Sequence, residues 1–296
     1  MFALGVEGLV TDQFGQVLLI QRSDSRTWAL PGGGLEANEL PSDGMVRELF
    51  EETGYKVFPV RLVQVSYIRG RNFDLLIFVL RGLLRGGSAQ TSDETLAVQF
   101  HKPDRLPFMV RSHHERLFST LYHPGGPPHL REQEKIPLVI HLLRKSVYRL
   151  LDLQRWWQGQ PLYQSPRQWH LETALIVPDG QGQVLWHEQN GMWHLPGGPC
   201  PKGQSPWAAA AHLAQAQTGQ PITITDLAGV YVTPENRMTL CFMGKIGVGT
   251  VAAACRWVTG EEIGNAAAPL HSTFIQNALT PRETTQFYYT NTPIHQ

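Results

Sequence analysis

The sequence has few cysteines, no excess of charge of either sign and no long hydrophobic run. Its 296 residues include three cysteines, Cys200, Cys241 and Cys255, whose spacing is not that of a metal-binding pair, so we expect a reduced, cytoplasmic chain. Lysine plus arginine and aspartate plus glutamate both total 25. This balance removes the overall electrostatic argument for nucleic acid or an anionic membrane as a partner.

Membrane and export signals are also missing from the sequence. The most apolar stretch, residues 136–157, is interrupted by charged residues, so no membrane span is expected. The N-terminal residues MFALGVEGLV lack a basic leader and a small-residue cleavage site, which favours a first strand over a signal peptide. With 42% hydrophobic and 17% charged residues, the chain has a globular composition and the length of two domains.

Residues 33–55, GGLEANELPSDGMVRELFEETGY, predict a helix with three carboxylates on one face. Glu48, Glu51 and Glu52 fall at i, i+3 and i+4, where side chains share a face and like charges repel. A hard divalent cation such as Mg²⁺ would neutralise that repulsion, because it prefers carboxylate and phosphate oxygens. Pro41 suits the first turn of this helix and Gly54 suits its end.

The apolar residues of the same helix indicate how it should pack. Val46, Leu49 and Phe50 lie opposite the three carboxylates on a helical projection. We therefore expect these three side chains to be buried against the core.

Residues 33–55 resemble the signature of the Nudix (MutT-like) hydrolases. The charged and glycine positions of that signature are all filled, and only Tyr55 is bulkier than the usual aliphatic residue; the matching positions are Gly33, Glu39, Arg47, Glu48, Glu51, Glu52 and Gly54. The resemblance implies an α/β fold, an α/β/α sandwich with a mixed sheet. It also implies Mg²⁺-dependent hydrolysis, with Mn²⁺ as the alternative ion, in which water attacks a phosphorus of a nucleoside diphosphate derivative.

The resemblance assigns roles to individual residues. The implied metal ligands are Glu48, Glu51, Glu52 and a backbone carbonyl of the Gly32-Gly33 turn. Glu51 or Glu52 would also handle the proton of the attacking water. Glu39 and Gly54 are the implied structural residues of the signature. Arg47 is implied to belong to the catalytic residues, where it would orient carboxylates.

Three arginines and one further acid complete the candidate site. Similar proteins place an acidic residue near the position of Glu94, which is either a base or ligand of the site or a solvated loop residue. Arg22, Arg69 and Arg71 flank the signature, and arginine suits phosphate oxygens, so they are candidates for substrate binding.

The second half of the sequence repeats the first. Residues 193–198, WHLPGG, match residues 28–33, WALPGG, at an offset of 165 that also relates Pro41 to Pro206 and Gly54 to Gly219. The acidic residues are not repeated, because Glu48, Glu51 and Glu52 correspond to Leu213, Ala216 and Gln217. We expect a second Nudix-like copy that builds the helix but holds no cation.

The predicted domain boundaries follow from this repeat. They are a catalytic domain (1–124), a linker with an amphipathic helix near 136–157 (125–165), a degenerate Nudix-like domain (166–282) and a tail (283–296). The linker helix would pack between the domains or form the seam of a homodimer. The tail, with Phe287, Tyr288 and Tyr289, is either an edge strand or loose.

Local patterns predict most elements of the first half. Strands are expected within residues 4–21, 57–68 and 73–81 and at the end of 92–100, and a second helix is expected over 106–122. His113, His114 and Glu115 resemble a metal cluster only superficially.

Two functions of different classes are compatible with these features. The first is a pyrophosphohydrolase acting on a small nucleotide substrate, such as ADP-ribose or a (d)NTP. The second is a nucleotide-metabolite sensor with little turnover. An RNA-decapping enzyme would need a basic groove, which the neutral composition does not favour.

Overall fold

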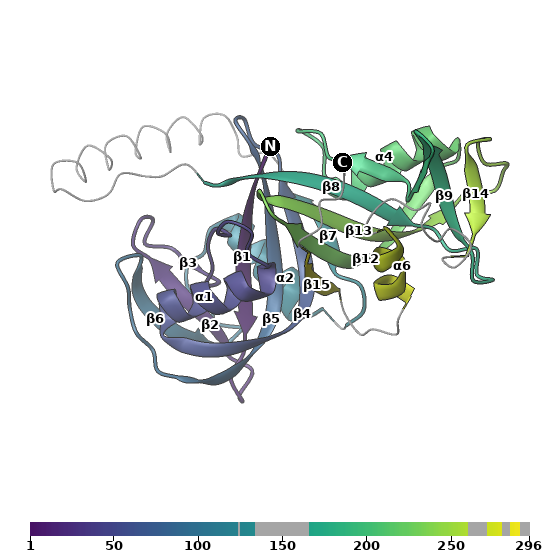
Figure 1. Ribbon diagram of the computed structural model, residues 1–296. Coiled ribbons are helices and arrows are strands. Elements are labelled where there is room, and N and C mark those ends of the chain that lie inside the picture. Colours follow the sequence, from purple (N-terminus) through teal and green to yellow (C-terminus); the bar gives the residue numbers. More distant parts are fainter. Residues whose placement is uncertain (124, 134–165, 260–270, 280–284, 291–296) are drawn as a thin grey trace.

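The largest sheet among the described residues contains strands from both halves of the chain. The structure is a computed structural model that describes residues 1–123, 125–133, 166–259, 271–279 and 285–290. Within these residues, nine strands form one sheet in the order β15-β12-β13-β8-β1-β5-β4-β7, with β11 paired to β8 (Figure 1).

The first half of the chain contributes four strands to this sheet. β1 (Phe2–Val10) is parallel to β5 (Asp74–Gly87), and β4 (Tyr55–Ile68) is antiparallel to β5 and parallel to β7 (His129–Gln133). A smaller sheet joins β3 (Trp28–Ala29), β2 (Val17–Arg22) and β6 (Thr95–His101).

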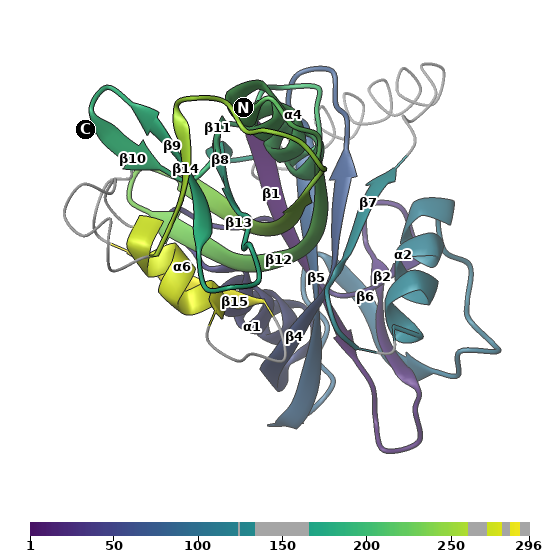
Figure 2. The same ribbon diagram turned by 90° about the vertical axis from the view of Figure 1, so that its right-hand side faces the viewer.

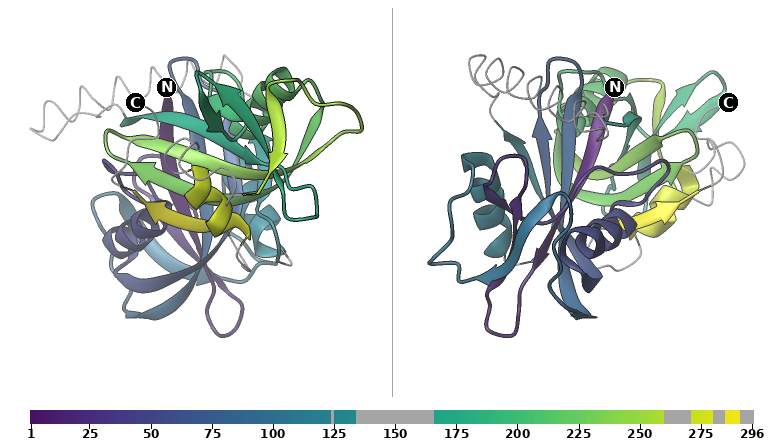
Figure 3. Two further views of the ribbon diagram at one scale, coloured as in Figure 1. Left: turned by 45° about the vertical axis from the view of Figure 1, so that its right-hand side comes forward. Right: turned by 90° about the vertical axis from the view of Figure 1, so that its left-hand side faces the viewer.

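Within residues 1–123, two helices cover opposite faces of the strands (Figures 2 and 3). α1 (Pro41–Thr53) packs on the face of β1 that carries Val6 and Val10, whereas α2 (Arg111–Leu121) packs on the face that carries Leu9. Successive strand residues point to opposite faces, so the buried strand β1 supplies a core on each side.

The second half repeats this strand pairing. β8 (Gln168–Ile176) is parallel to β13 (Arg237–Ile246), and β12 (Ile222–Thr233) is antiparallel to β13 and parallel to β15 (Gln286–Tyr289). A smaller sheet joins β10 (Met192–His194), β9 (Val184–Gln189) and β14 (Cys255–Val258). The other elements among the described residues of this half are β11 (Gly197–Pro199), α4 (Pro206–Thr218) and α6 (His271–Leu279).

The two halves meet at the centre of the sheet and share one core. β1 and β8 pair antiparallel through Phe2 with Trp169 and Ala3 with Gln168. One cluster of buried side chains extends from Leu49 of α1 to Ala214 of α4. The halves therefore bury apolar surface against each other as well as pairing backbone.

The expected packing of α1 was wrong in one respect. Leu49 is fully buried, but the side chains of Val46 and Phe50 are 37% and 52% exposed. The buried stripe instead contains Met45, Leu49 and Glu52, because Gly8 and Gly82 let Met45 and Leu49 lie directly against the strands. One of the three carboxylates thus lies on the buried stripe.

The second predicted helix begins later than expected. It starts at Arg111 rather than near residue 106. Before the helix, the Phe108 carbonyl accepts a hydrogen bond from the Trp28 backbone N–H, and Met109 forms an isolated β-bridge with Trp28. This segment is therefore held in an extended form.

The structure also bears on the tail, the linker and the membrane expectation. Of the alternatives for the tail, the structure shows a strand, β15, at the edge of the sheet. The predicted linker helix near 136–157 lies outside the described residues. Among the described residues, no helix is long and apolar enough to cross a membrane.

Candidate active site

Local sequence sets both ends of α1 and hence the position of the acidic residues. Pro41 occupies the first turn, after an extended Leu40. Gly54 ends the helix in the left-handed conformation, with φ of 71°, and its N–H donates to the Phe50 carbonyl over 2.9 Å. The 13-residue helix thus brings Arg47 and Glu52 to the glycine turn.

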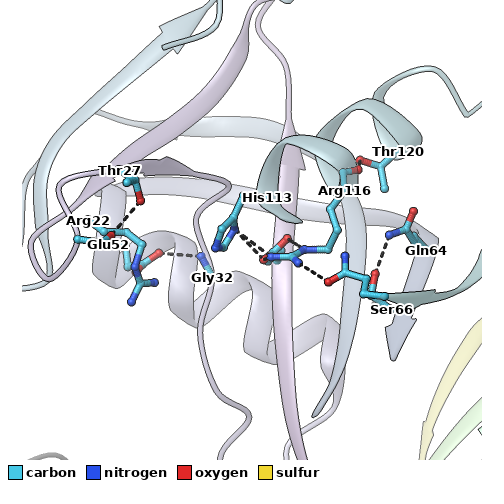
Figure 4. Close-up of polar contacts among 12 residues, drawn as sticks. Arg22, Thr27, Gly32, Glu52, Gln64, Ser66, His113, Arg116 and Thr120 are labelled. Atoms are coloured by element: carbon cyan, nitrogen blue, oxygen red, sulfur yellow. Dashed lines mark hydrogen bonds and ion pairs between the residues drawn. The ribbon is translucent and has the colours of Figure 1, made fainter. Parts of the chain in front are cut away.

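Glu52 is buried and fixed to the glycine turn (Figure 4). Its Oε2 atom accepts a hydrogen bond from the backbone N–H of Gly32 over 2.7 Å. Gly32 has φ of 150°, and a Cβ atom there would lie 2.1 Å from the Val6 carbonyl oxygen. Only glycine allows the turn to approach β1 and the carboxylate this closely.

Arg47 connects three carboxylates and the turn. Its guanidinium donates two hydrogen bonds to Glu39, over 2.8 and 2.9 Å, and one to the Gly34 carbonyl over 3.0 Å. It also donates to Glu48 over 2.9 Å and to Glu51 over 3.2 Å. A single planar donor group thus fixes the turn relative to the helix.

The carboxylates of this site are crowded. Burial raises the pKa of Glu52 to about 8; the Gly32 N–H acts against this rise, and the nearby Glu48 and Glu94 charges reinforce it. Burial likewise raises the pKa of Glu48, although Arg47 opposes the rise. The structure therefore brings Glu94 close to Glu48 and Glu52, whereas Glu51 is exposed.

These residues fit a hard divalent cation. In the described part of the chain, no three His, Cys, Asp or Glu side chains already converge in metal-ligand geometry. The donors are nevertheless carboxylate oxygens next to a glycine turn, and a Cβ atom at Gly33 would lie 2.5 Å from Glu48 Oε2. Carboxylates forced together at raised pKa, with backbone oxygens beside them, match the oxygen ligands of Mg²⁺.

The three candidate substrate arginines lie in different places. Arg22 pairs with Asp24 over 2.8 Å, and its charge lowers the pKa of Glu52, so it borders the acidic site. Arg69 and Arg71 follow the end of β4, where Lys202 of the second half donates to the Arg71 carbonyl over 2.7 Å. In the described residues, no contact joins Arg69 or Arg71 to the acidic side chains of α1.

A buried ion pair that the sequence did not predict lies next to the site. Arg116 of α2 donates to both carboxylate oxygens of Glu7 over 2.6 and 2.9 Å, and to His113 over 2.9 Å (Figure 4). Glu7 precedes Gly8, whose N–H bonds the Pro31 carbonyl of the glycine turn. A single glutamate within the apolar strand FALGVEGLV was the signal that could have revealed it.

The other two residues of the HHE triplet are used locally. The His114 ring packs against Phe118, and Glu115 pairs with Arg111 over 2.7 Å.

The corresponding turn in the second half makes the same contact with a neutral side chain. Gln217 Oε1 accepts from the Gly197 N–H over 2.8 Å, as Glu52 accepts from Gly32. In addition, Gln217 Nε2 donates to the Gly197 carbonyl over 2.8 Å. The amide therefore satisfies both backbone groups of Gly197 without any ion.

Comparisons with known proteins identify the family. The NUDIX domain family model matches residues 1–121. A MutT-like protein of Streptomyces ambofaciens is 36% identical over 135 residues, which cover 45% of this chain and 85% of the relative. The chain belongs to the Nudix family. It is therefore a hydrolase that acts on phosphoanhydride bonds.

Two further Nudix relatives come from Bacillus subtilis (strain 168). One, described as a candidate 8-oxo-dGTP diphosphatase, is 32% identical over 112 residues, covering 37% of this chain and 74% of the relative. The other, described as a candidate ADP-ribose pyrophosphatase, is 32% identical over 120 residues, covering 37% of this chain and 57% of the relative. The Nudix domain expected near the N-terminus is thus confirmed for residues 1–121.

Proposed function

We propose that the first half is a Mg²⁺-dependent pyrophosphohydrolase of a small nucleotide and that the second half is a degenerate Nudix-like copy. The observation that carries the first part is the Glu52 carboxylate, which is buried, bonded to Gly32 and crowded by Glu48 and Glu94. The observation that carries the second part is the matching Gln217 contact, made without a carboxylate.

The residues of the first half have distinct proposed roles. Glu48 and Glu52, with Glu51 at the exposed edge and a carbonyl of the Gly32-Gly33 turn, hold the cation. A bound Mg²⁺ supplies charge neutralisation for the phosphates and polarises the attacking water.

The surrounding residues orient the site and handle the proton. Arg47 and Glu39 hold the carboxylates and the turn in place. Glu94 lies on an exposed loop beside Glu48 and Glu52, where its carboxylate can accept the proton of the attacking water. Arg22 borders the same site and is the proposed contact of a substrate phosphate.

The substrate class follows from the relatives. One is described as acting on 8-oxo-dGTP and another on ADP-ribose, and both molecules contain a nucleoside diphosphate unit. We propose a nucleoside diphosphate derivative as the substrate, either a nucleotide sugar or a (d)NTP.

Product identification after a substrate screen tests the proposal. The protein is incubated with nucleotide sugars and (d)NTPs in the presence of Mg²⁺ or of EDTA. We expect a nucleoside monophosphate product with Mg²⁺, none with EDTA, and none from a folded Glu52→Gln variant. Turnover by Glu52→Gln at the wild-type rate would contradict the assignment of the site.

A nucleotide sensor is the alternative. A sensor would use the same residues, but it would bind a nucleotide tightly without releasing a product. Binding of a nucleotide by calorimetry, together with absent turnover across the whole screen, would favour it. The complete set of acidic residues in the first half favours the enzyme.

A further inference from the structure

The loop that precedes α1 is held by the second half of the chain. The Asn38 N–H donates to the side-chain oxygen of Asn236 over 3.3 Å, and the Asn236 N–H donates to the side-chain oxygen of Asn38 over 3.0 Å. Both residues have a left-handed backbone, with φ of 57° and 56°. Asparagine is one of the few side chains that adopt this conformation readily, so residue type and backbone agree at both positions.

The second half fixes its own side of this contact. Asn236 ends the turn between β12 and β13, and its carbonyl accepts a hydrogen bond from the His170 N–H of β8 over 2.9 Å. All three of these strands belong to the large sheet. Asn236 is therefore anchored to the sheet where it meets Asn38.

The held loop carries the carboxylate that orients Arg47. Glu39 directly follows Asn38, and its Oε2 atom accepts from the Glu36 N–H over 2.8 Å, which closes the loop. Both Glu39 oxygens also accept from Arg47, which in turn donates to Glu48 over 2.9 Å. The contact with the second half is thus one residue away from the carboxylate that positions the acidic face of α1.

The opposite contact also exists, but it supports a helix without acids. Gly203 lies 165 positions after Asn38, which is the offset of the repeat, and its N–H donates to Asp74 at the start of β5. Each half thus places one of its hairpins against the loop before the helix of the other half, as the subunits of a two-fold dimer do. Only the contact at Asn38 lies before an acidic helix, because α4 contains no aspartate or glutamate.

We propose that Asn236 is a positioning residue for the acidic site. It touches no reacting group, but it holds Asn38 and with it the Glu39 carboxylate. Glu39 in turn fixes Arg47, and Arg47 orients Glu48. Loosening this support lowers the affinity for a cation, because Mg²⁺ requires its oxygen ligands in near-ideal geometry. The second half then acts as a built-in partner subunit of the first, and this inference rests on the proposed acidic site.

Amide hydrogen exchange tests the contact without activity. Asn236→Gly removes the side-chain oxygen but still allows a positive φ, so the turn should persist. We expect the Asn38 and Glu36 amides of the full-length protein to exchange about fivefold faster or more, as read by NMR, while the amides of β1 are unchanged. Asn190→Gly, at an exposed asparagine of the second half with φ of 53°, is the matched control. Unchanged exchange at Glu36 would overturn the proposal, because the loop would then keep its form without Asn236.

Cation affinity is the second readout. Titration with Mn²⁺, followed by electron paramagnetic resonance, should give a Kd about fivefold higher in Asn236→Gly than in the wild type or in Asn190→Gly. Circular dichroism verifies that each variant is folded. Asn236→Asp keeps an acceptor for the Asn38 N–H, as Asp74 does for Gly203, and should restore the wild-type Kd. Equal Kd values in Asn236→Gly and the wild type would contradict the positioning role.

Turnover separates this inference from the proposed hydrolysis. Asn236→Gly should raise the Mg²⁺ concentration for half-maximal rate about fivefold and leave the KM for the nucleotide, measured at saturating Mg²⁺, unchanged. A wild type that turns over the nucleotide, with the same Mg²⁺ dependence in the variant, would overturn the positioning role and leave the hydrolysis intact. A wild type without turnover would contradict the hydrolysis, and the exchange and Mn²⁺ results would still decide the role of Asn236.

Discussion

At the scale of single residues, the site depends on which carboxylates are buried. Glu52 is on the buried stripe of α1 and bonds the glycine turn, whereas Glu51, one residue earlier, is exposed. Neighbouring acids of the same type therefore differ in environment, because successive residues of a helix project about 100° apart. Glu94 reaches the same group of charges from a loop distant in sequence.

Glu94 gives the first prediction. If its carboxylate accepts the proton of the attacking water, Glu94→Gln should lower kcat about 100-fold while changing KM little. Steady-state kinetics over a range of pH is the measurement, and the acidic limb of the wild-type profile should be altered in the variant. Glu36→Gln, an exposed acid before α1, is the matched control. An unchanged rate and pH profile would make Glu94 a solvated loop residue.

The buried Glu7–Arg116 pair gives a prediction about acid stability. Burial acts to raise the pKa of Glu7, but the Arg116 charge and the hydrogen bonds from His113 and Arg116 outweigh it and lower the pKa from 4.5 to about 2. A carboxylate whose folded-state pKa is lowered stabilises the fold above its unfolded pKa. Its contribution, on the order of 3 kcal/mol, is lost as the pH falls from about 4.5 to about 2.

Urea unfolding between pH 7 and pH 2.5 measures this loss. The Glu7→Gln variant should be less stable at pH 7 by about 3 kcal/mol, because Arg116 stays buried without its partner. It should also lose less stability than the wild type on acidification. Glu188→Gln, an exposed acid of the second half, should follow the wild-type curve. Parallel pH curves for wild type and Glu7→Gln would contradict the predicted role.

At the scale of elements, α1 and α4 have the same length and the same kinds of end residues but pack differently. Both have 13 residues, a proline in the first turn and a glycine end in the left-handed conformation, at φ of 71° for Gly54 and 74° for Gly219. Their packing differs, since α1 places Met45 and Leu49 over glycines, whereas α4 uses alanines. The residues that begin and end the helix are thus the same in α4, whereas the glutamates of α1 are absent from it.

These two glycines form a matched pair for mutation. Gly219→Ala should cost about 1 kcal/mol, the price of the left-handed conformation alone, because nothing lies within 4 Å of the added Cβ. Gly54→Ala should cost clearly more, because its Cβ would lie 2.5 Å from the Ser88 carbonyl oxygen. Free energies of unfolding from urea titration compare the two. Equal losses would show that the contact with Ser88 relaxes freely.

At the scale of the whole molecule, the shared sheet and core join the two halves. β1 pairs with β8, and one apolar cluster includes side chains of α1 and α4. Polar contacts at the junction converge on Asp74, which bonds Gly203 of the second half. Lys202 adds two bonds to the backbone of residues 71 and 72. We therefore expect the halves to unfold together.

Calorimetry of an Asp74 variant tests this coupling. The wild type should unfold in a single transition, and Asp74→Ala should lower its midpoint or split it in two, because the variant leaves the Gly203 N–H and the Tyr67 hydroxyl without their acceptor. Asp93→Asn, an exposed loop acid, is the control. A single transition at an unchanged midpoint in Asp74→Ala would show that the apolar core alone couples the halves.

Much of the site was predictable because its signals are local. The proline and glycine that bound α1, the glycine turn and the acids spaced along one face are all readable within 23 residues. The burial of the helix was predicted less well, since Val46 and Phe50 are exposed. The side chains that α1 buries depend on Gly8 of β1 and Gly82 of β5, because these glycines permit close packing of Met45 and Leu49.

Contacts between distant segments could not be predicted in the same way. The sequence by itself determined the family signature, the matching residues at a fixed offset in the second half and the absence of glutamates at the corresponding helix positions, because these depend on residue identity at fixed spacing. Only the tertiary structure decided which glutamate is buried, that Arg116 meets Glu7, and that Asp74 accepts a hydrogen bond from Gly203 of the second half. The last two contacts join residues 109 and 129 positions apart, and the spacing of residues along the chain does not predict such contacts.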